Sequence, residues 1–298
     1  MPGTASKNKG QLWIAVGLLL AALTVLLLLS GNRQDSRVAV DDGTGTIWIT
    51  PIADLPVNSF AGTLAARQGQ LGCKVYFMST SSNSEGPAYT ASQGVDVSEW
   101  QKEIQWQEVA AGGIDFAVLR CGFRRYVSGN LEQDASFEAN YAGAGEAGLR
   151  RGGYFFSQAI TPKEAKAEAK YLLKLIKDYD ITLNVAYDWE YIDNVDFGTA
   201  RTDKIKENTV TECAAAFCKT IADAGYQPAI YCNGMLGYFS YDLSKLSGVD
   251  VWYANYADPS PEFAYRIRMW QYSDKGKLEG VTGNVDLNLY FYDQASEK

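Results

Sequence analysis

The chain has 298 residues, of which 47% are hydrophobic and 21% charged, so it is long enough to bury at least one large core. Its 27 basic and 35 acidic residues give a formal net charge of −8, which argues against nucleic acid as a partner. The sequence contains no histidine, so the commonest general base and metal ligand is absent.

An apolar segment near the N-terminus predicts a membrane anchor over residues 12–30. Residues 12–29 carry no charge, and as a helix they would measure about 27 Å, roughly the thickness of a bilayer's hydrocarbon core. Two lysines lie in residues 1–11, so the positive-inside rule predicts a cytoplasmic stub and a single-pass protein of the cell membrane with its remainder outside. A cleaved signal peptide, which would leave a secreted protein, is the alternative interpretation.

Residues 31–92 are expected to form a linker and a small β-rich appendage whose purpose the sequence does not reveal. Strand-like runs occur at 46–50 and 74–78, and turns marked by Gly and Pro separate them. Residues 32–45 are polar and are interpreted as a linker, while the Ser-rich stretch 79–87 predicts a flexible boundary.

Strand and helix patterns alternate through the rest of the chain, which predicts a main domain over residues 93–294. The expected strands are 94–98, 114–121, 152–157, 181–188, 228–232, 249–253, 265–271 and 285–290. The expected helices are a stretch ending at 112–113, then 131–148, 162–177 and 203–225. Thr161, Pro162 and Glu164 suit the N-cap, first and third positions of the helix that they begin.

Repeated strand–helix units with strands buried on both faces predict an α/β fold with a parallel sheet. Eight strands in order suggest a closed, TIM-like barrel whose last helices are degenerate, and active residues of such barrels lie at the C-terminal strand ends. Cys121 and Cys232 lie in apolar strand patterns and are expected to be small buried hydrophobes, so a disulfide scaffold is not indicated.

Two carboxylates close one of these strands, in the triplet Asp188-Trp189-Glu190. Residues i and i+2 of a strand point to the same face, so both acids should project into one space while Trp189 packs on the other side. Paired acids at a strand end are what proton transfer to a glycosidic bond requires, although a pair of surface acids on a loop would look the same in sequence. Asp96 also lies at a strand end, whereas Asp286 comes early in the last strand and its height in the barrel is open.

Several motifs of the main domain follow one another in a fixed order: GVDVSEWQ at 94–101, RCGFR at 120–124, YFFSQA at 154–159, DWE at 188–190, and WQYS at 270–273 with VDLN at 285–288. Together they resemble glycoside hydrolase family 25, the Chalaropsis-type lysozymes (N-acetylmuramidases) of bacteria and phages. The resemblance covers about residues 93–292 and implies a flattened (β/α)5(β)3 barrel. It also implies cleavage of the β-1,4 bond from N-acetylmuramic acid to N-acetylglucosamine in peptidoglycan.

The resemblance further implies four catalytic acids. Glu190 matches the proton donor, Asp188 its partner, Asp96 the acid of the first strand and Asp286 the acid of the last. Neighbouring anions are expected to raise the pKa of Glu190 and keep it protonated. Asp188 would either hold the substrate's N-acetyl group as the nucleophile, with retention, or activate a water, with inversion.

Sugar rings stack on aromatic side chains, and candidates for this contact lie in the barrel strands: Tyr154, Phe156, Tyr253 and Trp270. For each of them core packing is an alternative role. Gln271 is a candidate to bond a sugar hydroxyl or Asp286. No cofactor and no metal are expected, although a carboxylate cluster holding a divalent cation is an alternative.

The expected partners are peptidoglycan glycan strands and, through residues 12–29, the lipid bilayer, with a monomeric catalytic domain. Two rival functions remain open. One is a membrane-tethered wall-binding protein with little or no hydrolysis. The other is an N-acetylglucosaminidase on the same barrel, because the loops that set bond specificity cannot be interpreted from sequence.

Overall fold

The computed structural model describes residues 39–41, 47–49, 89–192, 199–205, 209–256, 261, 263 and 265–293. The chain divides into two compact units, residues 1–50 and 51–298. In the first unit β1 (Ala39–Asp41) pairs antiparallel with β2 (Ile47–Ile49), so a strand lies where we expected only linker. Valine and isoleucine favour extended backbone, which explains this pairing. The expected anchor and the strand at 74–78 lie outside the described residues, and no helix among those described is long and apolar enough to cross a membrane.

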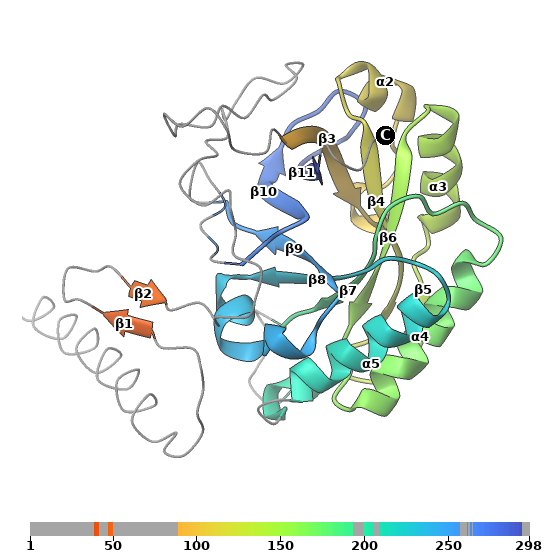
Figure 1. Cartoon of the computed structure of the whole chain (residues 1–298). Helices are drawn as coiled ribbons and strands as arrows, with labels where there is room; N and C mark the ends of the chain where they lie inside the picture. Colours follow the sequence, from red (N-terminus) through yellow and green to blue (C-terminus); the bar gives the residue numbers. More distant parts are fainter. Residues whose placement is uncertain are drawn as a thin grey trace, which may run out of the picture. The chain divides into compact units, whose positions relative to one another are not determined.

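In the second unit, the described strands form a barrel of eight members with one short strand added at its side (Figure 1). The barrel strands are β3 (Tyr89–Val97), β4 (Phe116–Arg124), β6 (Arg150–Ser157), β7 (Val185–Trp189), β8 (Pro228–Asn233), β9 (Asp250–Ala254), β10 (Met269–Gly276) and β11 (Val285–Asp293). The sheet order is β3-β11-β10-β9-β8-β7-β6-β4, and a direct β3–β4 pairing closes it. The eight-stranded α/β barrel expected from the sequence is therefore confirmed.

Strand direction decides which side chains meet at each end of the barrel. Seven of these strands run parallel to one another, whereas β11 runs antiparallel to both β10 and β3. The start of β11 therefore lies at the same end as the C-terminal ends of the other strands. Asp286 therefore lies at the catalytic end of the barrel axis, where it pairs directly with Asp96 near the end of β3.

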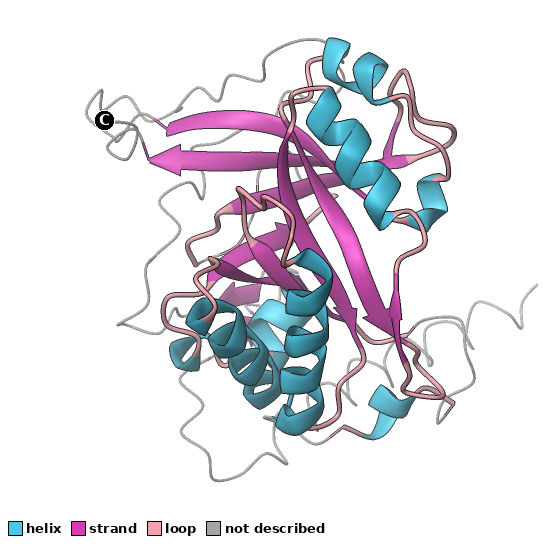
Figure 2. Cartoon of the chain, turned by 90° about the vertical axis from the view of Figure 1, so that its right-hand side faces the viewer, coloured by secondary structure: helices cyan, strands magenta, loops and turns pink. Residues whose placement is uncertain are grey.

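Helices cover the outside of the strands (Figure 2). They are α2 (Trp106–Ala111), α3 (Phe137–Glu146), α4 (Pro162–Ile176) and α5 (Thr209–Asp223), followed after β8 by a π-helix, η3 (Leu236–Ser240), and a 3-10 turn, η4 (Leu243–Lys245). Two more 3-10 turns are η1 (Glu99–Gln101) and η2 (Arg201–Lys204). No α-helix is found among the described residues after β9, as expected for a barrel whose last helices are degenerate.

Several boundaries differ from those expected. The predicted helix 131–148 begins only at Phe137, because residues 131–133 pair with β4 as a short strand, β5 (Leu131–Gln133). Strand β10 begins at Met269 rather than at residue 265, and β3 begins at Tyr89 rather than at residue 94. The start of α4 is as predicted, since the Thr161 hydroxyl accepts a hydrogen bond from the Glu164 main chain.

Both faces of the barrel strands are buried, and successive side chains alternate between them. In β7, Val185, Tyr187 and Trp189 belong to the layer beneath the helices, whereas Ala186 belongs to a smaller cluster inside the barrel. The interior cluster also contains Tyr154 and Trp252, whose rings meet edge to face at 5.8 Å. The same alternation decides which polar side chains enter the barrel mouth.

The cysteines of the described residues, Cys121, Cys213, Cys218 and Cys232, are buried free thiols. Cys121 and Cys232 act as small hydrophobes of the outer layer, as expected.

Candidate active site

The triplet at the end of β7 directs its two acids into one space. Asp188 and Glu190 both line a cavity of about 310 Å³ at the C-terminal end of the barrel strands. Trp189 is fully buried on the opposite side, and its indole N–H donates to the Ala159 carbonyl at 3.0 Å. The expectation for this i, i+2 pair is confirmed, and the reason is the alternation of a strand packed on both faces.

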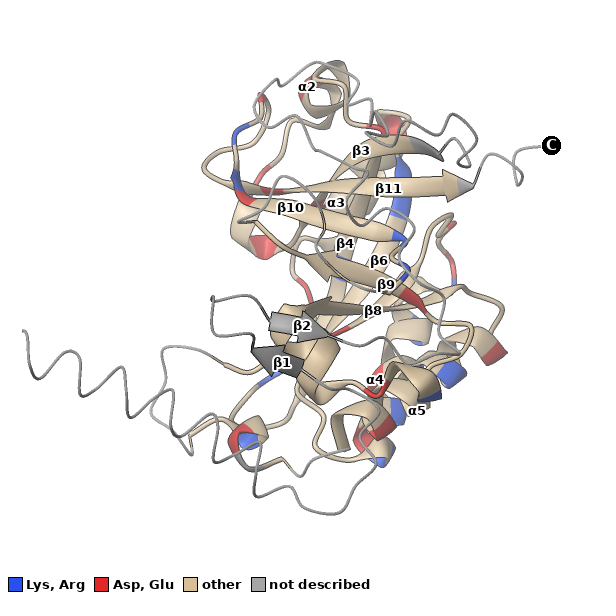
Figure 3. Ribbon diagram, turned by 60° about the vertical axis from the view of Figure 1, so that its left-hand side comes forward, with Lys and Arg blue, Asp and Glu red and all other residues tan. Residues whose placement is uncertain are grey.

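The other two acids join the same cavity from β3 and β11. Asp96 and Asp286 are opposite each other in the antiparallel β3–β11 pair, and their carboxyl groups share a hydrogen bond. Asp274, near the end of β10, is a fifth acid in the lining that the sequence did not single out. Figure 3 shows acidic positions where β10 ends and β11 begins. The structure thus brings all four predicted acids together.

Amide groups hold Asp96 in a fixed position. Its Oδ2 accepts hydrogen bonds from Gln271 Nε2 and Asn288 Nδ2, each at 2.7 Å. Gln271 is itself oriented by two phenols, since its Oε1 accepts from Tyr231 at 2.8 Å and from Tyr256 at 2.6 Å. The Gln271 amide therefore contacts Asp96 rather than Asp286, and its hydrogen-bonding groups are occupied within the site.

In the Asp96–Asp286 pair, the two carboxyl groups have different pKa values. Burial raises the pKa of Asp96 to about 6, while the hydrogen bonds from Asn288, Gln271 and Asp286 hold it down. Burial, together with the charges of Asp96 and Asp274, raises the pKa of Asp286 to about 8. Near pH 7 the proton therefore resides on Asp286, which donates to the ionised Asp96.

The second pair, Asp188 and Glu190, also holds a proton. Asp188 is 6% exposed, and burial raises its pKa well above the usual range, with further contributions from Glu190 and Asp96. The two carboxyl groups are hydrogen-bonded to each other. Asp188 Oδ1 is buried and has no hydrogen-bond partner among the described residues, so one acceptor of this carboxyl group is left unsatisfied.

One cation lies among the described residues that line the cavity. Arg120 projects inward from β4 and lowers the pKa of Asp188. Its guanidinium is already paired, with Nε 2.6 Å from Asp134 Oδ2 and Nη2 2.9 Å from Glu99 Oε1. Asp134 is fully buried and also accepts a hydrogen bond from the Glu99 main chain, so Arg120 is held in place as a fixed positive charge.

The five predicted substrate contacts divide according to the face of the strand. Tyr154, Phe156 and Gln271 line the cavity. Tyr253 and Trp270 instead belong to the outer layer, where Tyr253 stacks on Phe263 at 4.4 Å and Trp270 donates to the Asn255 carbonyl at 3.0 Å. We correct these two assignments, because a one-residue step along a strand moves a side chain to the opposite face.

The same alternation places other aromatic residues in the lining that sequence reasoning missed. Trp252, rather than its neighbour Tyr253, lines the cavity. Tyr231 and Tyr256 also line it and bind Gln271. Trp100 lies at the rim and is 75% exposed, which leaves its ring open to a sugar face. Among the described residues no group of three or more Cys, Asp or Glu side chains has the geometry of a metal site.

A closed α/β barrel with hydrogen-bonded carboxyl pairs and exposed aromatic rings at its catalytic end defines a glycoside hydrolase. The model of the family described as Glycosyl hydrolases family 25 matches residues 95–281. The chain belongs to this family, and the resemblance noted from its motifs is confirmed.

Individual relatives agree with this assignment. Lysozyme M1 of Streptomyces globisporus is 28% identical over 216 residues, which cover 69% of this chain and 70% of that protein. The lysozyme of Streptomyces coelicolor has the same fold, with a TM-score of 0.56 and 24% identity, and the match covers 68% of this chain and 94% of that one. The autolysin LytC of Streptococcus pneumoniae, solved with a synthetic peptidoglycan ligand, has a TM-score of 0.58 and 21% identity and covers 87% of this chain and 57% of that one.

Proposed function

We propose that this chain is a lysozyme that cleaves the β-1,4 bond between N-acetylmuramic acid and N-acetylglucosamine in peptidoglycan. Family membership and the similarity to Lysozyme M1 support the substrate. The observation that carries the chemistry is the hydrogen-bonded Asp188–Glu190 pair, which opens into a polar, aromatic-lined cavity at the barrel mouth.

Glu190 is the proton donor in this proposal. The leaving sugar oxygen is too basic to depart as an alkoxide near neutral pH, so a carboxylic acid must protonate it as the bond breaks. Glu190 lies one residue beyond β7 and is more exposed than Asp188, so its carboxyl group is the better placed of the two to reach the glycosidic oxygen.

Asp188 orients the substrate's N-acetyl group. Its unpartnered Oδ1 would accept the acetamido N–H, and that bond favours the ionised form of Asp188 and leaves the shared proton on Glu190. The acetamido oxygen then attacks the anomeric carbon while the leaving oxygen takes the proton. A water subsequently opens the cyclic intermediate and returns its proton to Glu190, with net retention. Activation of a water by Asp188, with inversion, is the competing route.

Asp96 supplies negative charge, and neither Asp96 nor Asp286 transfers a proton to the substrate. Near neutral pH Asp96 is an anion fixed by three hydrogen bonds, and it stabilises positive charge that develops at the anomeric carbon. Asp286 contributes by donating one of those hydrogen bonds.

We also propose that residues 12–29 anchor the enzyme in the cell membrane, with residues 1–11 in the cytoplasm and the barrel outside. The uninterrupted apolar run and the lysines before it support this topology. Fractionation of the producing cells tests it: recovery of the enzyme in the membrane fraction supports an anchor, and recovery in the medium with residues 1–30 removed supports a cleaved signal peptide.

Digestion of purified peptidoglycan by the full chain tests the activity. Borohydride reduction followed by mass spectrometry should find reduced muramic acid at the new ends, and Glu190→Gln should abolish their formation. Reduced glucosamine ends would instead establish an N-acetylglucosaminidase. Wall binding without release of fragments would establish a binding protein. NMR of the first-formed anomer separates retention from inversion.

A further inference from the structure

A buried glutamine connects the end of β6 to the proton donor. Gln158, which directly follows β6, is fully buried. Its Nε2 donates to the main-chain carbonyl of Glu190 at 2.8 Å and to that of Ser157 at 2.9 Å. Its Oε1 accepts from the Thr202 hydroxyl at 3.2 Å, and Thr202 is also fully buried. Both ends of the amide are therefore occupied, which defines its orientation.

This contact begins where the sheet pairing stops. The last pair of the parallel β6–β7 ladder is Ser157 with Trp189, so Glu190 lies one residue beyond the ladder. The side chain of Gln158 continues the connection between these two strands by one residue. Since Ala159 also accepts the Trp189 indole N–H, residues 157–159 hold both Trp189 and the main chain of Glu190.

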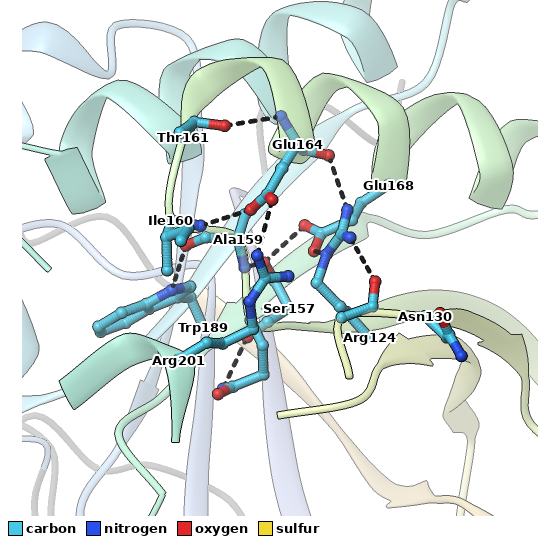
Figure 4. Close-up of polar contacts among 12 residues, drawn as sticks. Arg124, Asn130, Ser157, Ala159, Ile160, Thr161, Glu164, Glu168, Trp189 and Arg201 are labelled. Carbon is cyan, nitrogen blue, oxygen red and sulfur yellow. Dashed lines mark hydrogen bonds and ion pairs between the residues drawn. The ribbon is translucent and has the colours of Figure 1, made fainter. Parts of the chain in front are cut away.

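The segment that holds Glu190 is itself anchored to α4. The Ser157 hydroxyl donates to Glu168 Oε2 at 2.6 Å and accepts from the Ala159 main-chain N–H at 3.2 Å. Glu168 is fully buried and forms an ion pair with Arg124, at 2.5 Å between Oε1 and Nε (Figure 4). A buried charge pair on one side and the Gln158 amide on the other therefore give the end of β6 little freedom to shift.

We propose that Gln158 is a positioning residue that sets the reach of the Glu190 carboxyl group toward the scissile oxygen. The inference rests on the proposed function, in which Glu190 is the proton donor. Because a side chain follows its main chain, release of the Glu190 carbonyl would let the carboxyl group drift from the leaving oxygen. A misplacement of about 1 Å at a reacting group costs on the order of 100-fold in rate.

Two substitutions at this position separate positioning from a purely structural role. Gln158→Leu removes both donors and keeps the size of the side chain, and we expect kcat to fall by about 10- to 100-fold while KM changes by less than about threefold. Gln158→Glu is buried beside two carbonyl oxygens and should stay protonated from pH 5 to 8. Its carboxylic acid can donate one hydrogen bond, so it should retain more kcat than Gln158→Leu over this range.

Gln93→Leu is the matched control. Gln93 is another buried barrel glutamine with a side-chain partner, Tyr272 at 2.9 Å, and it does not line the cavity. It should lose stability without loss of kcat. If Gln158→Leu does not fold, Thr202→Val replaces it: removal of the hydroxyl that orients the amide should lower kcat by about threefold at unchanged KM.

The measurements are kcat and KM on peptidoglycan from pH 5 to 8, with circular dichroism and a thermal melt for each variant. Folded variants whose kcat stays within twofold of the wild type would overturn the positioning role. So would equal losses in Gln158→Leu and Gln158→Glu at every pH. An inactive wild type would instead refute the proposed function, because no Gln158 substitution enters that comparison.

Discussion

Asp286 lies directly opposite Asp96 across the β11–β3 pair, and the two carboxyl groups share a hydrogen bond. The last strand thus supplies a proton that the first strand's carboxylate accepts. Because burial raises the pKa of Asp286 to about 8 and that of Asp96 to about 6, this distribution persists between these values. Asp286 acts in this interval as a neutral hydrogen-bond donor.

Asp286→Asn should therefore be a mild substitution. The asparagine amide can donate to Asp96 as the protonated carboxyl does, so we expect kcat/KM at pH 6.5 to fall by less than about tenfold. Asp286→Leu removes the donor and should cost on the order of 100-fold. Steady-state kinetics on peptidoglycan check both, and an equally large loss in the two variants would show that Asp286 works as a carboxylate.

The pH dependence of kcat/KM should show a plateau between about pH 6 and 8. Below it Asp96, with a pKa of about 6, gains a proton and no longer stabilises positive charge. Above it Asp286, with a pKa of about 8, loses its proton and places a second anion beside Asp96. In Asp286→Asn the alkaline limb should move to higher pH. If the alkaline limb stays unchanged in this variant, then a group other than Asp286 causes it.

Stability should fall as the pH rises from 5 to 8.5. The pKa values of Asp96, Glu168 and Asp286, about 6, 7 and 8, lie above the ordinary values of 3.8, 4.5 and 3.8. The folded state therefore retains protons that the unfolded chain releases, so the contribution of these three groups to stability is full below about pH 4 and is lost as the pH rises through 6 to 8. We expect a Tm about 5 °C higher at pH 5 than at pH 8.5. Glu168→Gln should reduce that difference in a thermal melt. A Tm that is higher at pH 8.5 than at pH 5 would contradict the raised pKa values of these three carboxyl groups.

Trp270 and Tyr231 should respond to substitution in opposite ways. Trp270→Phe loses buried area in the outer layer and should cost about 2 kcal/mol of stability with little change in the kcat of the folded enzyme. Tyr231→Phe removes the hydroxyl that orients Gln271 and should lower kcat by about tenfold with little loss of stability. Denaturant unfolding and kinetics on both variants check this. Loss of kcat in Trp270→Phe would restore it to the substrate site.

The alternation of strand side chains was sufficient to place Asp188 and Glu190 from sequence, because the two acids interrupt an otherwise apolar strand. It was not sufficient for Tyr253 and Trp270. Both faces of a barrel strand are buried, so hydrophobicity does not tell the interior from the outer layer. Polar neighbours are the better signal: Gln271 faces inward, and Arg120 is a charge within an apolar strand that enters the cavity.

The height of Asp286 could not be predicted because it depends on strand direction, which is a tertiary property. The polar residues near the end of β6 belong to the YFFSQA motif at 154–159, but nothing in the motif indicates what their side chains contact. Gln158 follows an apolar strand and precedes a well-capped helix, a context in which an exposed loop residue is the ordinary expectation. Its role becomes visible only when β7 lies beside β6.

The antiparallel β11 is the last strand of the barrel to be synthesised, and the active site is incomplete without it. A chain that has emerged only as far as β10 has an open barrel, no Asp286, and an Asp96 that lacks both Asn288 and its proton-bearing partner. Hydrolysis must then wait until the last strand joins the first.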